Sequence, residues 1–516
     1  MKKLVSLLLA AILLLSCGLV PAMAETARTG GTLIAWLPSD PSSYNTNATQ
    51  DDFAIMLMEN VMSKLLKFDC AGNLLPDLAA TWDISEDGLT YTFHLRENVK
   101  WHDGEPFSSE DVLWSMQKIA AEGYSAGYLA GVTSMEAPDA NTFVVTLNAQ
   151  DAGLLYNLSW YGMYILPKHL YEGQDWLTCE AATTKPIGTG AYKFVESQMG
   201  VSYTLEANMD YFMGQPQTDK LIFSVITDAN TAVQAFQNGE IDYLGINLAG
   251  SNLETVKASG LATIHTWPLA SRYYTAMNMT GTYTSDLNVR KAIALGVDRE
   301  ALLNKALGGN GAVAEGFAPA AIAWAYNADD VMPARDVDAA IALLEGAGYK
   351  KGADGFFFTL DFPTMAESPF PEIATVFKDS MKDIGININI INLEMAAYIN
   401  RLMVDKAFDL TILSGYQGPD ASALASRVGS TGAMNFFNYS STALDEELAA
   451  GVATTDPTER ALHYYAAQKI LSEELPILPL VEAVSNEVSA TYLSDTPCSA
   501  EKLCATSEYY TIKINK

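Results

Sequence analysis

Aromatic rings and carboxylates recur in three loops that each adjoin the end of a predicted β-strand. The first loop region holds Trp36 and Tyr44, the second holds Glu367, and the third holds Tyr416 and Asp420. A ring supplies a flat apolar wall and a carboxylate supplies a charged anchor, and a pocket for a small solute needs both. In open α/β sheets, ligands lie beyond the carboxyl ends of the strands. We therefore predict that these five residues contact a ligand.

Two further rings, Tyr273 and Tyr274, lie on a predicted strand that crosses between domains, and we expect them to add a floor to the same pocket. Motifs for common enzyme chemistry are absent: the chain has no G-x-S-x-G, H-E-x-x-H, C-x-x-C or Walker sequence. These features favour binding over catalysis. An exported hydrolase with dispersed catalytic residues stays open as an alternative.

A metal or haem site is not expected, and we predict no cofactor. None of the histidines falls in the three loops, and they are scattered along the chain: His94, His102, His169, His265 and His463. Histidine is the side chain that would hold nickel or haem iron most directly.

The elements that must position the loops read as α/β. Residues 89–95 alternate apolar and polar side chains, which is typical of a half-buried strand. Farther on, predicted strands at 356–362, 386–390 and 407–413 alternate with helical patterns such as 372–384. Such alternation predicts a largely parallel sheet with right-handed crossovers. Ser109 is a possible N-cap for a helix that follows the strand at residues 89–95.

Two motifs carry a resemblance to a known family. Residues 82–112 read WDISEDGLTYTFHLRENVKWHDGEPFSSEDV, and residues 186–192 read PIGTGAY. Both resemble signatures of the family 5 extracellular solute-binding proteins, which are the oligopeptide, dipeptide and nickel receptors of ABC importers. The first motif identifies the scaffold and carries no information on the ligand.

The resemblance implies an α/β, two-lobed, periplasmic-binding-protein-like fold (type II, cluster C) with an inserted third lobe. It divides the chain into a signal peptide (1–24), a discontinuous domain I (25–65, 186–268 and 486–516), an inserted lobe (66–185) and domain II (269–485). It also implies a monomeric receptor that closes over its ligand by a hinge motion and delivers it to the permease subunits of an ABC transporter.

The same resemblance points to peptide as the ligand, with a departure. The third loop looks like the segment where peptide receptors place an aromatic residue and an aspartate for the α-ammonium, and Tyr416 matches the aromatic residue. The second loop looks like the place where dipeptide receptors carry an arginine for the carboxylate, but it holds Glu367. A receptor for an oligosaccharide, a polyamine or another cation therefore stays open.

Charge and the first residues bear on location. The 516-residue chain has a formal net charge of −30, which disfavours nucleic acid and anionic lipid as partners. Lys2 and Lys3, an apolar stretch and an A-x-A site ending at Ala24 read as a secretory signal. A lipobox-like sequence ending at Cys17 leaves lipidation open. Either way the chain is exported to the periplasm or the outer face of the cytoplasmic membrane.

Cysteines are even in number after Ala24, which in an exported chain favours disulfides. Cys498 and Cys504 are near each other in a loop-like tail and form the expected pair, with Cys70 and Cys179 as a second pair.

Overall fold

The computed structural model describes residues 28–69, 73–245, 248, 250–418, 420–499, 502–503 and 508–516. The predicted signal with Cys17, and also Cys70 and Cys504, lie outside the described residues, so the bridge from Cys498 to Cys504 stays a prediction. Cys179 is a free cysteine whose side chain packs against the apolar core of the first domain. The predicted pair of Cys179 with Cys70 is therefore wrong.

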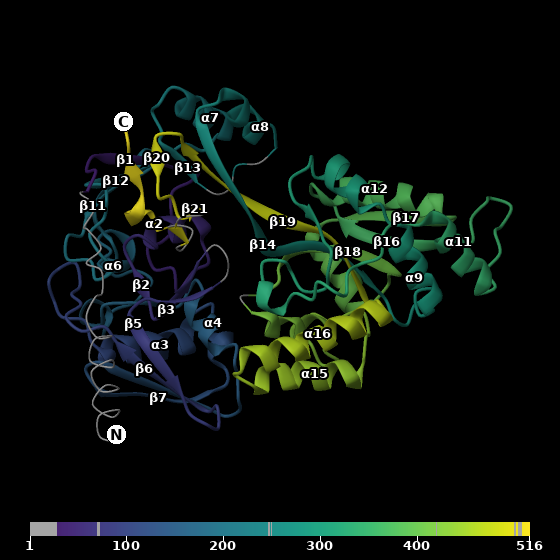
Figure 1. Ribbon diagram of the computed structural model, residues 1–516, viewed down its shortest axis with the longest axis horizontal. Coiled ribbons are helices and arrows are strands. Elements are labelled where there is room, and N and C mark those ends of the chain that lie inside the picture. The colour runs from purple at the N-terminus through teal and green to yellow at the C-terminus, as the bar shows by residue number, and fades with distance from the viewer. Residues whose placement is uncertain are drawn as a thin grey trace, which may run out of the picture.

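Two long antiparallel strands join the two bodies of the molecule, as Figure 1 shows. These are β14 (Ala262–Met277) and β19 (Ile477–Ala490), which pair from Ala262 with Ala490 to Ala276 with Ile477. The pairing is interrupted between Pro268 and Arg272, where β14 passes from one body to the other. Both chain crossings thus run through one two-stranded ribbon.

These two strands belong to a nine-stranded mixed sheet. Its order is β10-β11-β12-β1-β13-β19-β14-β18, and β15 pairs with β19. The remaining bounds are β1 (Thr32–Leu37), β10 (Tyr192–Gln198), β11 (Ser202–Ala207), β12 (Lys220–Val225), β13 (Tyr243–Gly245), β15 (Ala312–Val313) and β18 (Leu410–Tyr416). Helices α7 (Ala229–Gln237) and α8 (Gly250–Ser259) accompany the first-domain strands.

The largely parallel sheet predicted for the strands at 356–362, 386–390 and 407–413 is found only in part. The first two pair in parallel as β16 (Phe358–Met365) and β17 (Ile386–Leu393), whereas the third, β18, pairs antiparallel with β14. In the nine-stranded sheet β1 pairs in parallel with β12 and β13, and the other strand pairs are antiparallel.

The 66–185 range builds its own antiparallel sheet, in the order β5-β6-β8-β7. Its strands are β5 (Ala79–Ile84), β6 (Thr90–Leu95), β7 (Val132–Asp139) and β8 (Thr142–Leu147). The predicted alternation is seen in β6, where Tyr91 and Phe93 are buried and His94 is exposed. Helix α3 (Ser109–Glu122) covers this sheet and begins with a capping box between Ser108 and Asp111. The N-cap is Ser108, one residue before the predicted Ser109.

Shorter elements complete this region. Helix α2 (Asp52–Met58) is followed by a turn and short strands. The small elements are β2 (Ser63–Lys64), β3 (Leu66–Phe68), β4 (Leu74–Pro76), α4 (Leu154–Ser159), β9 (Tyr164–Ile165), α5 (Lys168–Tyr171) and α6 (Glu180–Thr183).

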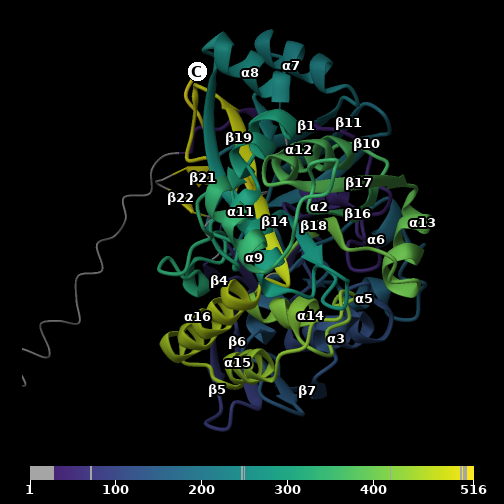
Figure 2. The ribbon, with the colours of Figure 1, turned by 90° about the vertical axis from the view of Figure 1, so that its right-hand side faces the viewer.

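Helices surround the strands of the second body. They are α9 (Leu287–Gly296), α11 (Val337–Gly346), α12 (Phe370–Asp383), α13 (Met395–Ile399), α14 (Leu424–Val428), α15 (Thr442–Ala453) and α16 (Pro457–Glu474). Figure 2 shows α15 and α16 at the same end of the molecule as β5, β6 and β7. There the Ala152 N–H donates to the Val452 carbonyl at 3.1 Å, so the inserted lobe and the second body also touch away from the ribbon.

Three apolar clusters correspond to three packing units. One runs from Leu33 to Ile512 with gaps, one from Leu65 to Ile165, and one from Tyr274 to Val481. Leu166, Tyr171 and Trp176 pack in the first-domain cluster, although the predicted inserted lobe extends to residue 185. The chain therefore returns to the first domain's core about twenty residues before that boundary.

The two glycines of the PIGTGAY motif are needed because the backbone of residues 60–61 passes very close to them. The Gly190 N–H donates to the Val61 carbonyl at 2.9 Å, and the Tyr192 N–H donates to the Asn60 carbonyl at 2.9 Å. A Cβ at Gly188 would lie 1.8 Å from the Val61 carbonyl oxygen, and one at Gly190 would lie 2.6 Å from the Asn60 carbonyl oxygen. Larger side chains would force this returning segment away from the first domain.

Candidate ligand-binding cleft

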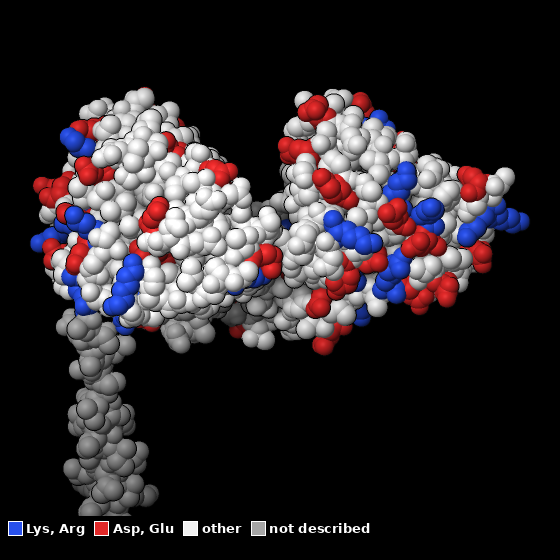
Figure 3. Space-filling model, turned by 90° about the horizontal axis from the view of Figure 1, so that it is seen from above, with Lys and Arg blue, Asp and Glu red and all other residues white. Residues whose placement is uncertain are grey.

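A cavity of about 1140 Å³ lies between the bodies, beside the point where β14 crosses. Figure 3 shows the molecule from above, with a hollow separating the two bodies. Three parts of the chain line the cavity: the first domain with the inserted lobe, the interrupted stretch of β14 from Trp267 to Ser271, and the second body through residues 321–324 with Tyr416 and Gly418.

Aromatic rings dominate the lining. The first domain and inserted lobe contribute six of them: Phe68, Tyr124, Tyr128, Tyr156, Trp160 and Tyr161. Trp267 on β14 and Trp324 and Tyr416 from the second body complete the set. Such rings bury large apolar areas and offer faces for stacking and for cations.

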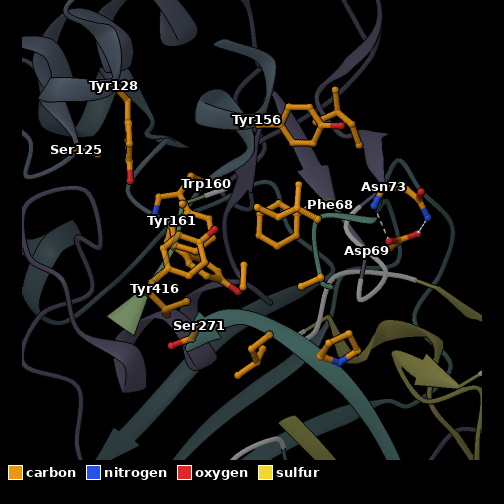
Figure 4. Close-up of a pocket in the computed structure, with 18 of the residues that line it drawn as sticks. Phe68, Asp69, Asn73, Ser125, Tyr128, Tyr156, Trp160, Tyr161, Ser271 and Tyr416 are labelled. Atoms are coloured by element: carbon orange, nitrogen blue, oxygen red, sulfur yellow. Dashed lines mark hydrogen bonds between the residues drawn. The ribbon is translucent and has the colours of Figure 1, made fainter. Parts of the chain in front are cut away.

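Three of these rings form a column that joins the two walls, and Figure 4 shows them close together. The Trp160 ring stacks on Tyr416 with centroids 4.4 Å apart and on Phe68 with centroids 5.7 Å apart. Tyr161 lies against Trp160 at 4.8 Å. Burial raises the pKa of Tyr416 well above its usual range, so its hydroxyl stays neutral. The column therefore presents an uncharged apolar surface at one side of the cavity.

The charged groups in the described lining are acidic. Asp69 is 4% exposed, and its carboxylate accepts hydrogen bonds from the Asn73 backbone N–H and side-chain amide, each at 2.9 Å. Asp52 is exposed in the first turn of α2. Among the described residues that line the cavity there is no lysine, arginine or histidine. The cavity thus combines aromatic faces with negative charge.

Of the residues predicted from sequence, Tyr416 lines the cavity, whereas Trp36 and Tyr44 do not. Trp36 is 6% exposed and its indole Nε1 donates to the Ile226 carbonyl at 2.7 Å. Tyr44 is also 6% exposed and packs on Phe194 with ring centroids 5.2 Å apart. Both rings belong to the apolar core of the first domain, and Tyr44 contacts both strands of the β10–β11 hairpin through Phe194 and Tyr203.

The other predicted residues of the second body are also outside the cavity lining. Tyr274 is 4% exposed in the core of that body, and Tyr273 packs edge-on against Phe370 with ring centroids 6.0 Å apart. Glu367 is exposed and follows β16, which runs through Met365. The crossing strand turns Tyr273 and Tyr274 toward domain II, so they form no floor.

Asp420, predicted as a charged anchor, is instead a structural residue. It is 1% exposed and accepts two hydrogen bonds from Arg460, one of them from Nη1 at 2.8 Å. It also caps a short 3₁₀ turn by accepting from the Ser422 N–H at 2.9 Å. With both oxygens engaged, this carboxylate holds the loop that carries Tyr416 and does not face the cavity.

Sequence reasoning missed the rings of the inserted lobe. The strand-end rule was applied to the sheets of the two main domains, whereas these rings come from short helices, turns and, for Phe68, the short strand β3. The stretch from Tyr156 to Tyr164 offered a signal, since four of its nine residues are Tyr or Trp. The inserted lobe already has a cluster of 21 buried residues as its core, so rings beyond that core are available to line a binding site.

Comparison with known protein families gives one extended match. The family model described as bacterial extracellular solute-binding proteins, family 5, middle, matches residues 73–436. Di/tripeptide-binding protein 1 of Pseudomonas aeruginosa is 27% identical over 473 residues, which cover 86% of each chain. The oligopeptide-binding protein AppA of Bacillus subtilis is 28% identical and covers 72% of this chain and 71% of AppA.

Solved structures share the fold. The ABC transporter substrate-binding protein CtaP of Listeria monocytogenes superposes with a TM-score of 0.82 at 25% identity, over 95% of this chain and 100% of CtaP. The murein tripeptide-binding protein MppA in its unliganded open form gives 0.84 at 22% identity, over 95% and 99%. Helicobacter pylori DppA in complex with the peptide STSA gives 0.70 at 25% identity, over 95% and 99%.

Proposed function

Because this chain belongs to the bacterial extracellular solute-binding proteins of family 5, we propose that it is the exported receptor of an ABC importer and that it binds peptides in the aromatic cleft. The observation that carries the proposal is the cavity itself, which has a volume of about 1140 Å³ and is lined by rings from both bodies. Pockets for drug-sized ligands have volumes of about 300–1,000 Å³, so this one has room for several linked residues.

Peptide is supported over the other solute classes by the two relatives described above, which are named for di/tripeptide and oligopeptide binding. The geometry fits the same class. Stacked aromatic rings accept apolar and basic side chains. A peptide offers side chains of both kinds.

Capture is proposed to work by closure of the two bodies about the β14–β19 ribbon. The closer superposition on an open, unliganded neighbour than on a peptide complex supports an open arrangement here. A ligand drives closure only through its preference for the closed state, and contact with rings on both walls provides that preference. The solute is released to the permease unchanged, so no bond is made or broken.

Export and partners belong to the same proposal. Among the described residues, no helix has both the length and the apolar character to cross a membrane. We propose a monomer, exported by its first 24 residues, that meets the membrane through the permease or through lipid on Cys17.

The test is native mass spectrometry and isothermal titration with pools of peptides, oligosaccharides and polyamines. The expected result is a peptide adduct on the wild-type protein and loss of that adduct in Trp160→Ala. Trp82→Ala is the matched control, because Trp82 is also half-buried but lies on β5 away from the cavity. Binding confined to a non-peptide pool, or equal binding by both variants, would contradict the proposal.

A further inference from the structure

The described residues that line the cleft include acidic but no basic side chains, and the lysines and arginines described below, which lie behind the lining, are engaged in contacts within the protein. Two lysines lie directly behind the inserted-lobe wall, and each has a side chain that is 4% exposed. Lys64 Nζ lies 2.9 Å from Glu59, and Lys67 Nζ lies 2.7 Å from Glu508. Neither ammonium group is available to a ligand without leaving a buried carboxylate unpaired.

The arginines behind the second-body wall are engaged as well. Arg460 is paired with Asp420, and its guanidinium carbon lies 4.5 Å from the centroid of the Trp324 ring. Arg427 donates to the backbone carbonyls of the loop that carries Tyr416. Arg272 is 3% exposed and donates to Glu482 and to two backbone carbonyls. These cations shape the protein's own loops.

A ligand carboxylate in this cleft would therefore lose water and gain no cationic partner from the described lining. Burying an unpaired carboxylate is strongly unfavourable. A positively charged group is favoured instead, because it can lie against the faces of tyrosine and tryptophan rings and close to the exposed carboxylate of Asp52. Cationic groups are therefore favoured over carboxylates for two reasons: the described lining has acidic but no basic side chains, and the basic side chains behind it are paired within the protein.

We infer that the receptor does not read a free C-terminal carboxylate, and that its ligands are basic, apolar peptides whose C-terminus is amidated or extends beyond the cleft. This inference rests on the proposed function, since it names the class of peptide that the same site takes. It departs from an end-to-end clamp on short peptides, which needs a cation for the carboxylate.

The experiment uses one library of random tetrapeptides synthesised twice, as free acids and as C-terminal amides, with binding to the full-length protein measured by affinity selection and then by titration of the selected peptides. We expect each amide to bind at least as tightly as its acid, and replacement of a Lys by Glu within the peptide to weaken binding by about tenfold or more. Acids that bind about tenfold more tightly than their amides would overturn the inference while supporting a peptide receptor. Failure of both libraries to bind would overturn the proposed function, and the inference with it.

A matched pair of variants locates the charge preference. Asp52→Asn removes a carboxylate at the cavity, and Asp87→Asn removes an equally exposed one in the turn between β5 and β6, so both change the net charge equally. We expect Asp52→Asn to narrow the ratio of Lys-peptide to Glu-peptide affinity by about two- to fivefold and Asp87→Asn to leave it unchanged. An unchanged ratio in Asp52→Asn would place the preference outside the cavity and contradict the inference.

Discussion

The two walls of the cleft are built in different ways. The inserted-lobe wall presents six rings to the cavity, whereas the second-body wall presents two, Trp324 and Tyr416. Buried ion pairs lie behind both walls, so the walls differ in how much aromatic surface each offers to a ligand. The comparison teaches that charged residues near a binding site can serve the site's shape without touching the ligand.

The largest expected effect concerns the second-body wall. Arg460→Ala leaves Asp420 buried and unpaired, so we expect the free energy of unfolding to fall by about 3–5 kcal/mol. Lys257→Ala removes an exposed pair with Glu254 and is expected to cost about 0–1 kcal/mol. Urea denaturation of the three proteins measures both values.

A double variant sharpens this prediction. Arg460→Met combined with Asp420→Leu leaves no unpaired charge, and it is expected to recover a large part of the lost stability. If Arg460→Ala were as stable as the wild type, the ion pair would not hold this wall, and Asp420 would again be a candidate for direct contact with ligand.

The next effect concerns the ring-rich wall. Trp160→Ala removes the centre of the column between Phe68 and Tyr416, and we expect peptide affinity to fall by about 2 kcal/mol, as at central aromatic positions of interfaces. Titration calorimetry checks this against Trp82→Ala, for which wild-type affinity is expected. Equal losses in the two variants would show that the rings act through stability and not through contact.

Acid is expected to destabilise the junction between the inserted lobe and the first domain by protonating His102. Burial lowers the pKa of His102 to about 4, while its Nε2 faces the Gly190 carbonyl at 2.9 Å and its Nδ1 accepts from the Gly188 N–H. Because the folded pKa lies below the ordinary value, this contribution to stability is complete above about pH 6.5 and is lost as the pH falls toward 4.

The measurement compares wild type with His102→Gln in urea at pH 7 and pH 5. Between these values the wild type is expected to lose about 1–2 kcal/mol more of its unfolding free energy than the variant. A pH dependence that is identical in both proteins would contradict the assignment of a neutral imidazole at this junction.

The smallest expected effect concerns the far ring of the column. Tyr416→Leu keeps an apolar side chain but removes the stack on Trp160, so peptide affinity should fall by about 0.5–1.5 kcal/mol. Tyr273→Leu, on the neighbouring strand but outside the cavity, is the control for which titration should find no change. A loss in Tyr273→Leu that matched the loss in Tyr416→Leu would mean that strand packing decides affinity.

The same contrast explains what could be predicted from sequence. The motif at 82–112 identified the family, whose model matches residues 73–436, and with it the fold that solved structures share. Tyr416 was found because it ends a strand at the cleft. The strand-end rule was wrong for Trp36, whose indole donates to the carbonyl of Ile226, a residue 190 positions away in sequence.

Long-range pairing accounts for the other errors. The partner of Asp420 is 40 residues farther along the chain, and no local pattern announces that Arg460 will reach it. Five of the six rings of the inserted lobe come from turns and short helices, where periodicity does not mark the exposed face, and the sixth, Phe68, ends the three-residue strand β3. The sequence alone did not predict the side-chain contacts between residues that are far apart in the chain.

The central claim is that one ligand touches both walls of the aromatic cleft. Hydrogen exchange measured by mass spectrometry, with and without the tightest peptide from the libraries, tests it most directly. The account predicts slower exchange in residues 124–128 and 156–161 of the inserted lobe together with residues 321–324 and 416–418 of the second body. Protection on one wall alone, or protection confined to the segments around Tyr44 and Glu367, would contradict it.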